Sequence, residues 1–180
     1  GHVPGDAKNY DGNPISAPTF DTDSVGTPTV EYKPADADDS AYTAAAPKNV
    51  GKYTIRITTA ETDTFKAAFS TMAFEIKPRE VTISGVTAGG KTYDGNAKAK
   101  ITAARGIDGL VDGDKVSIVT GKASYNDENV GNGKTVTFYD FALSGEDAAN
   151  YVLSAQPEGT TANISAKELT ITDLAVRDKQ

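Results

Sequence analysis

The residues with the clearest potential for chemistry are two copies of a tyrosine–aspartate–glycine triplet, in the stretches KNYDGN and KTYDGN. They are Tyr10, Asp11 and Gly12, and Tyr93, Asp94 and Gly95. A tyrosine ring can stack on a sugar and an aspartate can bind calcium, so the triplets could form a duplicated ligand site. Asp-Gly next to strand-forming residues also favours a two-residue hairpin of type I′. We favour this structural interpretation, because the turn accounts for the triplet without a ligand.

The usual catalytic combinations lack members. The one histidine, His2, belongs to an initial GH that resembles a cleavage scar, so no Ser–His pair is expected. The chain has no cysteine, so neither a Cys–His pair nor a thiolate metal site is expected. Gly133–Thr135 reads GKT, but the first glycine of a phosphate-binding loop would fall at Glu128. A hairpin turn at Asn132–Gly133 explains this stretch better. We therefore predict that the chain is not an enzyme and assign no catalytic residue.

Three oxygen-rich loops are the remaining candidates for a metal site. They are Asp36–Asp39, Asp108–Asp114 and Asn126–Asn129. The first does not follow the EF-hand pattern, because Ala41 and Pro47 stand where a glycine and a glutamate are needed. Solvated acidic turns explain all three loops. We predict no bound cofactor, with calcium as the metal to which such loops are best suited.

The charge pattern limits the partners. The formal net charge is −7, and lysine and arginine form no concentrated patch of the kind that nucleic acids or anionic membranes require. No run of about 18 apolar residues is present, so we predict no membrane insertion. A monomer with an acidic, self-repelling surface is expected.

The elements that must position the triplets are organised as a repeat. Besides the triplets, NVG recurs at Asn49 and Asn129, and IKPREVTI from Ile76 recurs as ISAKELTI from Ile164, in the same order along the chain. Two diverged tandem copies give this pattern. The residues after Ile164 correspond, position by position, to the residues between Ile76 and Tyr93. We therefore expect a further copy to follow, so that the chain is part of a longer array.

Each copy is expected to consist of strands. Thr29–Lys33, Gly51–Thr59 and Ser70–Lys77 alternate apolar and polar residues, as a half-buried strand does. Glu61–Phe69 and Gly145–Tyr151 could each form a helical turn. We predict an all-β chain of two small antiparallel domains in tandem, sandwich-like or β-grasp-like and elongated. Their ranges are 1–79 and 80–180, with 167–180 as the first strand of a following repeat.

The second copy, with KTYDGNAKAKI, GLVDGDKVSI, NVGNGKTVTF and LSGEDAANYVL, resembles the YDG repeat domain of bacterial surface and adhesin-like proteins over Val81–Ile171. The first copy resembles the MBG-type repeat that accompanies it. The resemblance implies an all-β unit strung in series along a secreted, surface-anchored polypeptide, and it implies no catalytic residues. We therefore expect a stalk or spacer at the bacterial cell surface, whose partners are neighbouring repeats of the same polypeptide.

A second hypothesis is a ligand-binding module. Exposed tyrosines and acidic loops could recognise a host glycan or protein, since tyrosine is a favoured contact residue. The candidate surface consists of Tyr32, Tyr42, Tyr125 and Tyr139. A covalent bond between a lysine and an asparagine beside an acid, known from some bacterial surface domains, also stays open at the level of sequence.

Overall fold

The computed structural model describes residues 7–19 and 27–172, so His2 lies outside the described residues. The fold is all-β, as predicted, with 48% strand and no α-helix in the described part of the chain. The helix that a β-grasp unit packs on its sheet is therefore missing there. Two short 3-10 turns are present, η1 at Asp39–Ala41 and η2 at Ala148–Asn150. The second lies inside the predicted helical turn Gly145–Tyr151.

The chain forms two compact units. Unit 1 contains the segment up to Val81 together with Gly109–Ser117 and Leu143–Ser154. Unit 2 contains Thr82–Asp108, Ile118–Ala142 and the segment from Ala155 onward. These units are defined by contacts in space, whereas the ranges 1–79 and 80–180 describe repeats of the sequence and stay a prediction.

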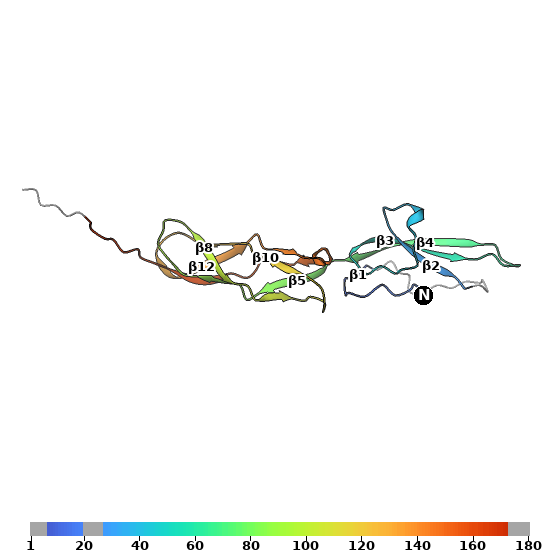
Figure 1. Ribbon diagram of the computed structural model, residues 1–180, viewed down its shortest axis with the longest axis horizontal. Helices are drawn as coiled ribbons and strands as arrows, with labels where there is room; N and C mark the ends of the chain where they lie inside the picture. The colour runs from blue at the N-terminus through green and yellow to red at the C-terminus, as the bar shows by residue number, and fades with distance from the viewer. Residues whose placement is uncertain (1–6, 20–26, 173–180) are drawn as a thin grey trace, which may run out of the picture. The chain divides into compact units, whose positions relative to one another are not determined.

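Unit 1 is built on a four-stranded sheet in the order β1-β4-β3-β2 (Figure 1). Its strands are β1 (Lys8–Asn9), β2 (Thr29–Pro34), β3 (Gly51–Thr59) and β4 (Ala68–Lys77). β3 has the bounds that alternation in the sequence predicts. It pairs antiparallel with β4 along its full length, and β1 pairs with β4 in parallel.

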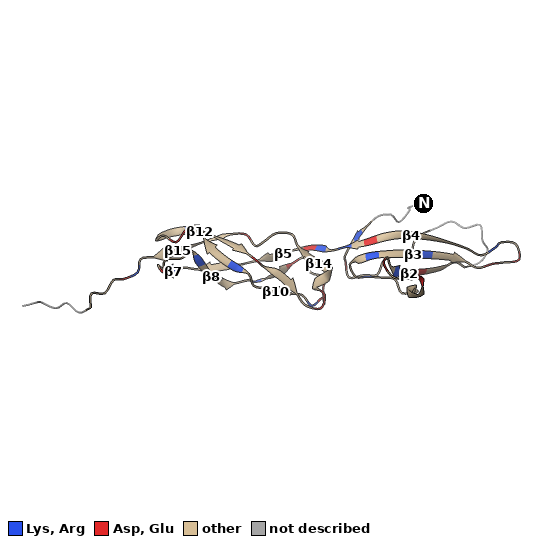
Figure 2. Ribbon diagram, turned by 90° about the horizontal axis from the view of Figure 1, so that it is seen from above, with Lys and Arg blue, Asp and Glu red and all other residues tan. Residues whose placement is uncertain are grey.

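One face of this sheet forms the core of unit 1. Ile55 and Ile76 are almost completely buried, and the Tyr53 ring stacks on Phe74 across the β3–β4 ladder at 5.3 Å. Successive side chains of a strand point to opposite faces, so the residues between them face outward. Figure 2 shows acidic and basic residues interspersed along β2, β3 and β4 instead of separated by sign.

Unit 2 is built on a six-stranded sheet in the order β6-β8-β11-β12-β15-β7. Its strands are β6 (Thr87–Gly89), β7 (Lys91–Thr92), β8 (Lys98–Ala103), β11 (Lys122–Tyr125), β12 (Gly131–Tyr139) and β15 (Thr160–Ser165). β6 also packs near β15, so the sheet curls into a nearly closed, barrel-like form. Val136, Phe138 and Ile164 are buried inside it.

Short strands complete the fold. They are β5 (Arg79–Ser84), β9 (Gly106–Asp108), β10 (Ser117–Val119), β13 (Ala142–Ser144) and β14 (Tyr151–Leu153). β10 and β13 form a two-stranded sheet. Within unit 1, residues 79–81 of β5 pair in parallel with β14. Within unit 2, residues 82–84 pair antiparallel with β9.

The predicted hairpin turn at Asn132–Gly133 is wrong. Both residues lie inside β12, where the register with β15 shifts between Gly131 and Lys134. Gly133 has φ of 60°, and its N–H donates to Oδ1 of Asn163 at 2.8 Å. A β-bulge uses a glycine in this conformation as readily as a hairpin turn does, so the local sequence signal is shared by both.

Residues after β15 do not form a strand within the described part of the chain. Residues 166–172 carry no regular secondary structure, and residues 173–180 of the predicted next strand lie outside the described residues. None of the described segments forms a helix with the length and hydropathy needed to cross a membrane.

Candidate functional site

Each of the two tyrosine–aspartate–glycine turns follows a short strand that pairs in parallel with a longer strand of its unit. In unit 1, β1 pairs in parallel with the end of β4, and the Tyr10 N–H donates to the carbonyl of Lys77 at 2.9 Å. In unit 2, β7 pairs in parallel with the end of β15, and the Tyr93 N–H donates to the carbonyl of Ser165 at 2.8 Å. Each turn therefore starts beside the last strand of its unit's sheet.

In each turn, a lysine side chain bonds both the aspartate side chain and the backbone carbonyl of the asparagine that follows the glycine. Lys8 Nζ donates to Oδ1 of Asp11 at 2.7 Å and to the carbonyl of Asn13 at 2.8 Å. The Asn13 N–H donates to the same Asp11 oxygen at 2.9 Å. We call this arrangement of lysine, aspartate and asparagine the lysine clasp. In it, Oδ1 of the aspartate is bonded by groups from the turn itself.

The second turn has the same lysine clasp. Lys91 Nζ donates to Oδ1 of Asp94 at 2.7 Å and also to the carbonyl of Asn96. The Asn96 N–H donates to Asp94 at 3.3 Å. The hydrogen bond from Lys91 lowers the pKa of Asp94, as the one from Lys8 lowers the pKa of Asp11. Both aspartates are therefore held ionised and bonded within their own turns.

The predicted type I′ hairpin is wrong at both triplets. Gly12 has φ of 78° and Gly95 has φ of 75°, but neither Asp11 nor Asp94 has a positive φ. Type I′ requires positive φ at both central residues. The strand before each turn pairs in parallel with a distant strand, so the triplet does not connect two antiparallel neighbours. The turn is closed by the lysine clasp and not by hairpin pairing.

The tyrosines of the two turns have different environments. Tyr10 is 1% exposed, and its hydroxyl donates to Oδ2 of Asp114 at 2.8 Å. The Tyr151 hydroxyl donates to the same oxygen, and the two rings meet edge to face at 5.4 Å. Burial, reinforced by the hydrogen bond to Asp114, raises the pKa of Tyr10 to about 12. Tyr93, in contrast, is 40% exposed.

Segments from later in the chain cover the Tyr10 turn within unit 1. The Val111 N–H donates to the Tyr151 hydroxyl at 3.0 Å, and a Cβ on Gly12 would lie 2.7 Å from Cγ1 of Val111. The side chain of Asn150, 5% exposed, accepts from the Val50 N–H at 2.9 Å. Nothing lies within 4 Å of the corresponding position on Gly95. We call Val111, Asp114 and Tyr151 the cap of the Tyr10 turn.

Sequence reasoning missed the cap. Asp114 lies in an oxygen-rich loop that we interpret as a solvated turn, and Tyr151 ends the stretch Gly145–Tyr151, for which we predict only a helical turn. A buried tyrosine needs a partner for its hydroxyl, which is the signal that could have indicated an acidic residue near Tyr10. The sequence does not identify which of its acidic residues that is.

Half of the predicted ligand surface is buried, which is a correction to the sequence analysis. Tyr32 is 5% exposed and Tyr125 is 3% exposed. The Tyr125 hydroxyl donates to the carbonyl of Gly89 at 2.8 Å inside unit 2. Both side chains point to the core face of their strands, so neither can contact a ligand. Tyr42 and Tyr139 retain exposed area, Tyr139 with 38%.

Tyr42 borders a hollow of about 780 Å³ on unit 1. The guanidinium of Arg56 lies 3.8 Å from the centre of the Tyr42 ring and also bonds Glu31 at 2.8 Å. Lys33 pairs with Asp39 at 3.1 Å. Because these charged groups pair with one another and Arg56 covers one ring face, Tyr42 has less area free for stacking on a sugar.

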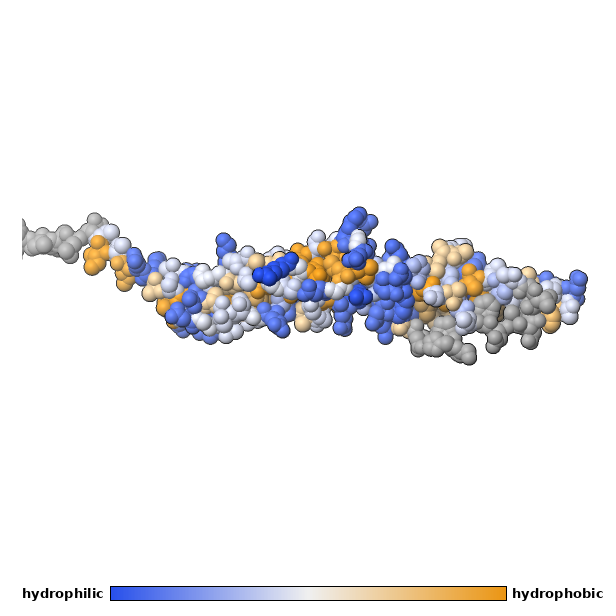
Figure 3. All heavy atoms as spheres, turned by 90° about the horizontal axis from the view of Figure 1, so that it is seen from below, coloured by the Kyte–Doolittle hydropathy of each residue, from blue (hydrophilic) through white to orange (hydrophobic). Residues whose placement is uncertain are grey.

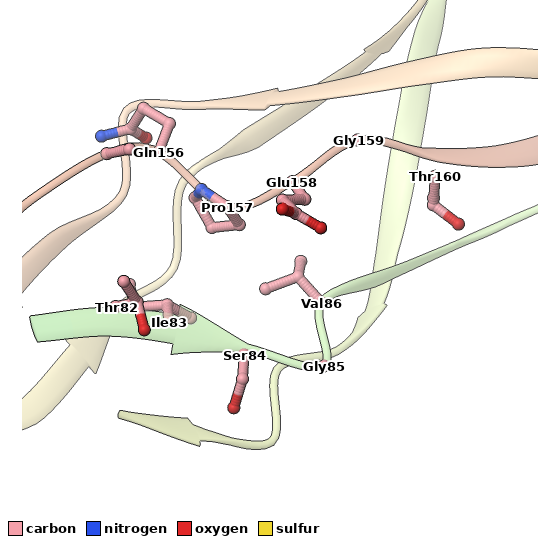
Figure 4. A pocket seen from close by; sticks show the side chains of 11 residues that line it. Thr82, Ile83, Ser84, Gly85, Val86, Gln156, Pro157, Glu158, Gly159 and Thr160 are labelled. Atoms are coloured by element: carbon pink, nitrogen blue, oxygen red, sulfur yellow. The ribbon is translucent and has the colours of Figure 1, made fainter. Parts of the chain in front are cut away.

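A second hollow, of about 450 Å³, lies in unit 2 between residues 82–86 and 155–160 (Figure 4). Glu158 is the one charged residue among those that line it, all of which lie in the described part of the chain. The other polar side chains that line it are the hydroxyls of Thr82, Ser84 and Thr160 and the amide of Gln156. Within residues 7–19 and 27–172, no group of three or more His, Asp or Glu residues could hold a metal ion.

Comparison with known protein families identifies a domain in one part of the chain. A family model described as the YDG domain matches residues 77–162, which is a single copy and includes the second triplet. No curated protein matches the chain. A YDG domain is therefore present from residue 77 to residue 162, and the resemblance predicted from the sequence is confirmed for that part.

Proposed function

We propose that the chain is a structural spacer in a large secreted or cell-surface bacterial protein of the adhesin type. In this proposal the first copy is a repeat of the MBG type and the second copy is the YDG domain, so that two small β domains follow each other in tandem. The units act mechanically, by separating other parts of the polypeptide from the cell surface.

The observation that carries the proposal is the lysine clasp of both turns. The groups that could have bound a ligand, Asp11 and Asp94, are already bonded to a lysine and to the backbone of their own turns. A repeated element whose polar groups are satisfied internally is suited to hold a fold together. At each triplet, Oδ1 of the aspartate is therefore already occupied by groups of its own turn.

The outer surface is also consistent with a spacer. Charges of both signs occur on the strands of unit 1, and the formal net charge of the chain is −7. Such surfaces keep a protein soluble and unassociated. We therefore propose an extracellular, monomeric chain whose natural neighbours are other repeats of the same polypeptide.

A direct test replaces this segment in its parent protein. An unrelated β-repeat segment of the same contour length should preserve cell adhesion, whereas deletion without replacement should reduce it. Surface display of each version, measured with an antibody to a distant tag, is the control. Loss of adhesion with the length-matched replacement, at equal display, would contradict the spacer role. Small-angle scattering of the purified chain should give an elongated particle.

A ligand-binding module is the second candidate function, and the hollow beside Tyr42 is the observation that favours it. Its rim includes Phe69, which is 72% exposed, next to a row of threonines on β2, β3 and β4. A glycan array and a binding assay on host cells test this candidate. Binding that disappears in Tyr42→Ala and Phe69→Ala but persists in Tyr139→Ala would establish the module and displace the spacer.

A further inference from the structure

The Tyr93 turn of unit 2 is an uncovered copy of the Tyr10 turn. The parallel strand pair, the bond from the tyrosine N–H to the last strand and the lysine clasp are the same in both. The difference lies in the cap. Tyr10 is 1% exposed under Asp114 and Tyr151, whereas Tyr93 is 40% exposed.

The segment after β15 gives a second, independent indication. Ile76 and Ile164 occupy equivalent places, because they pair with Lys8 and Lys91 at the entry of the two turns. At equal distances after them stand Val81 and Ile83 in β5, and Leu169 and Ile171 after β15. The residues named in this comparison have these exposures: Val81 2%, Ile83 6%, Leu169 93% and Ile171 87%.

Two aliphatic side chains are thus almost fully exposed where their counterparts are buried. Figure 3 shows apolar atoms on the segment that precedes residue 173. Burial of a leucine or isoleucine side chain stabilises a fold, so covering these two side chains would favour docking. The counterpart β5 is ordered by pairing with β14 through residues 79–81 and with β9 through residues 82–84.

We propose that Tyr93 and the segment Lys167–Ile171 together form a docking surface for one further YDG-type unit that follows in the same polypeptide. This unit presents a carboxylate and a tyrosine, equivalent to Asp114 and Tyr151, to the Tyr93 hydroxyl. It also provides a strand equivalent to β14, which pairs in parallel with Lys167–Leu169. The inference rests on the proposed function, since it specifies how one repeat is held by the next.

Three features of this surface favour a further YDG-type unit as the group that docks on it. The Tyr93 hydroxyl needs an acceptor, the two aliphatic side chains need an apolar cover, and the backbone of Lys167–Leu169 needs a strand. The cap of the Tyr10 turn supplies the acceptor, and β14, which begins at Tyr151 itself, supplies the strand. A soluble sugar or a metal ion satisfies at most one of the three requirements.

The test extends the full chain with a second copy of residues 93–172 placed after Gln180. The added copy thus begins with its own equivalent of Tyr93, directly after Gln180. This tyrosine lies at the same distance from Ile164 as Tyr93 lies from Ile76, so the spacing of the repeat is kept. Two signals are measured by peptide mass spectrometry: acetylation of Tyr93 by N-acetylimidazole, and hydrogen exchange of the amides of Lys167–Ile171. Both rates should fall by about tenfold or more relative to the 180-residue chain.

The matched control carries Asp114→Ala and Tyr151→Ala in the added copy alone. Tyr93 should then react about as fast as in the 180-residue chain, while the buried Tyr125 of the added copy stays protected. A second extension with two added copies in series gives the first added copy a neighbour of its own. Absence of protection at Tyr93 and Lys167–Ile171 in both extensions overturns the proposal.

The two proposals fail in different ways. Without docking, the length-matched replacement can still preserve adhesion, and the spacer then consists of units joined by unpaired segments. If the replacement abolishes adhesion while docking occurs, the spacer role is wrong and the docking surface remains.

Discussion

Tyr10 and Asp114 are 104 residues apart in the sequence, and the hydroxyl of the first donates a 2.8 Å hydrogen bond to the second. Asp114 also accepts from Tyr151, so one carboxylate oxygen serves two buried tyrosines. The bond connects the first tyrosine–aspartate–glycine turn to a loop of the YDG domain at residues 77–162, within one compact unit. The Tyr93 turn has no such connection in the described part of the chain. Most of the predictions below use this asymmetry.

Removal of the Tyr10 hydroxyl should destabilise the chain more than removal of the Tyr93 hydroxyl. Tyr10→Phe deletes a buried hydrogen bond to a charged group, worth about 1.5–3 kcal/mol. Tyr93→Phe, the matched control, changes an exposed hydroxyl and should alter the free energy of unfolding by less than about 0.5 kcal/mol. Urea denaturation followed by circular dichroism measures both. Equal effects would show that the bond to Asp114 does not stabilise the fold.

Stability should fall at alkaline pH in a range set by Tyr10. Its pKa is raised from 10.0 to about 12, first by burial and then by the hydrogen bond to Asp114. Between these values the unfolded chain loses the phenolic proton while the folded chain keeps it, so the free energy of unfolding decreases as pH rises. Below pH 10 this contribution is fully present. Denaturation between pH 9 and 12 should show a smaller slope for Tyr10→Phe than for the unchanged chain.

The two turn glycines should differ in their tolerance of a side chain. Gly12→Ala and Gly95→Ala both place an L residue at positive φ, which costs about 1–2 kcal/mol. At position 12 the new Cβ would also lie 2.7 Å from Val111, whereas at position 95 it meets nothing within 4 Å. Gly12→Ala should therefore lower the melting temperature further. A larger effect at position 95 would contradict the description of the cap.

Asn150 should be important for unit 1 because it is buried and bonded to backbone. Its Oδ1 accepts from the Val50 N–H at 2.9 Å. Asn150→Ala leaves that N–H without its side-chain partner and should cost about 1–3 kcal/mol in the free energy of unfolding. Hydrogen exchange of the Val50 amide provides a local measurement. Exchange that stays as slow in the variant would mean that another group satisfies this amide.

The purified chain should have the mass calculated from its sequence, without loss of ammonia. Lys91 Nζ lies 3.2 Å from Oδ1 of Asn96, which is the nearest arrangement to a lysine–asparagine cross-link in the two clasps. The amine must be neutral to attack the amide carbon, and the adjacent acid must be able to donate a proton. Lys91 instead bonds Asp94, whose lowered pKa keeps it ionised. Intact mass spectrometry decides the question, since each cross-link would remove one ammonia.

The fold class and several strands could be predicted from local patterns. β3 begins at Gly51 and ends at Thr59, as its alternating residues indicate, because a half-buried strand leaves a direct record in the sequence. The YDG domain was recognised from an ordered set of short stretches, and the family match over residues 77–162 confirms it.

Features that depend on distant partners could not be predicted. Asp-Gly is a strong hairpin signal, but a window of a few residues does not reveal that β1 and β7 pair in parallel with strands far along the chain. The burial of Tyr32 and Tyr125 depends on which strand face meets the core. Two identical triplets likewise give one buried and one exposed tyrosine, because Asp114 and Tyr151 cover Tyr10 alone.

The parallel pairing of β1 with β4 affects how unit 1 would respond to pulling. A force applied before Lys8 and after Lys77 would act along this strand pair, in shear, so that its hydrogen bonds carry the load together. An antiparallel hairpin pulled from its two free ends would open one bond at a time. β7 and β15 reproduce this geometry in unit 2, so each unit closes with a pair of strands oriented to resist extension of the polypeptide.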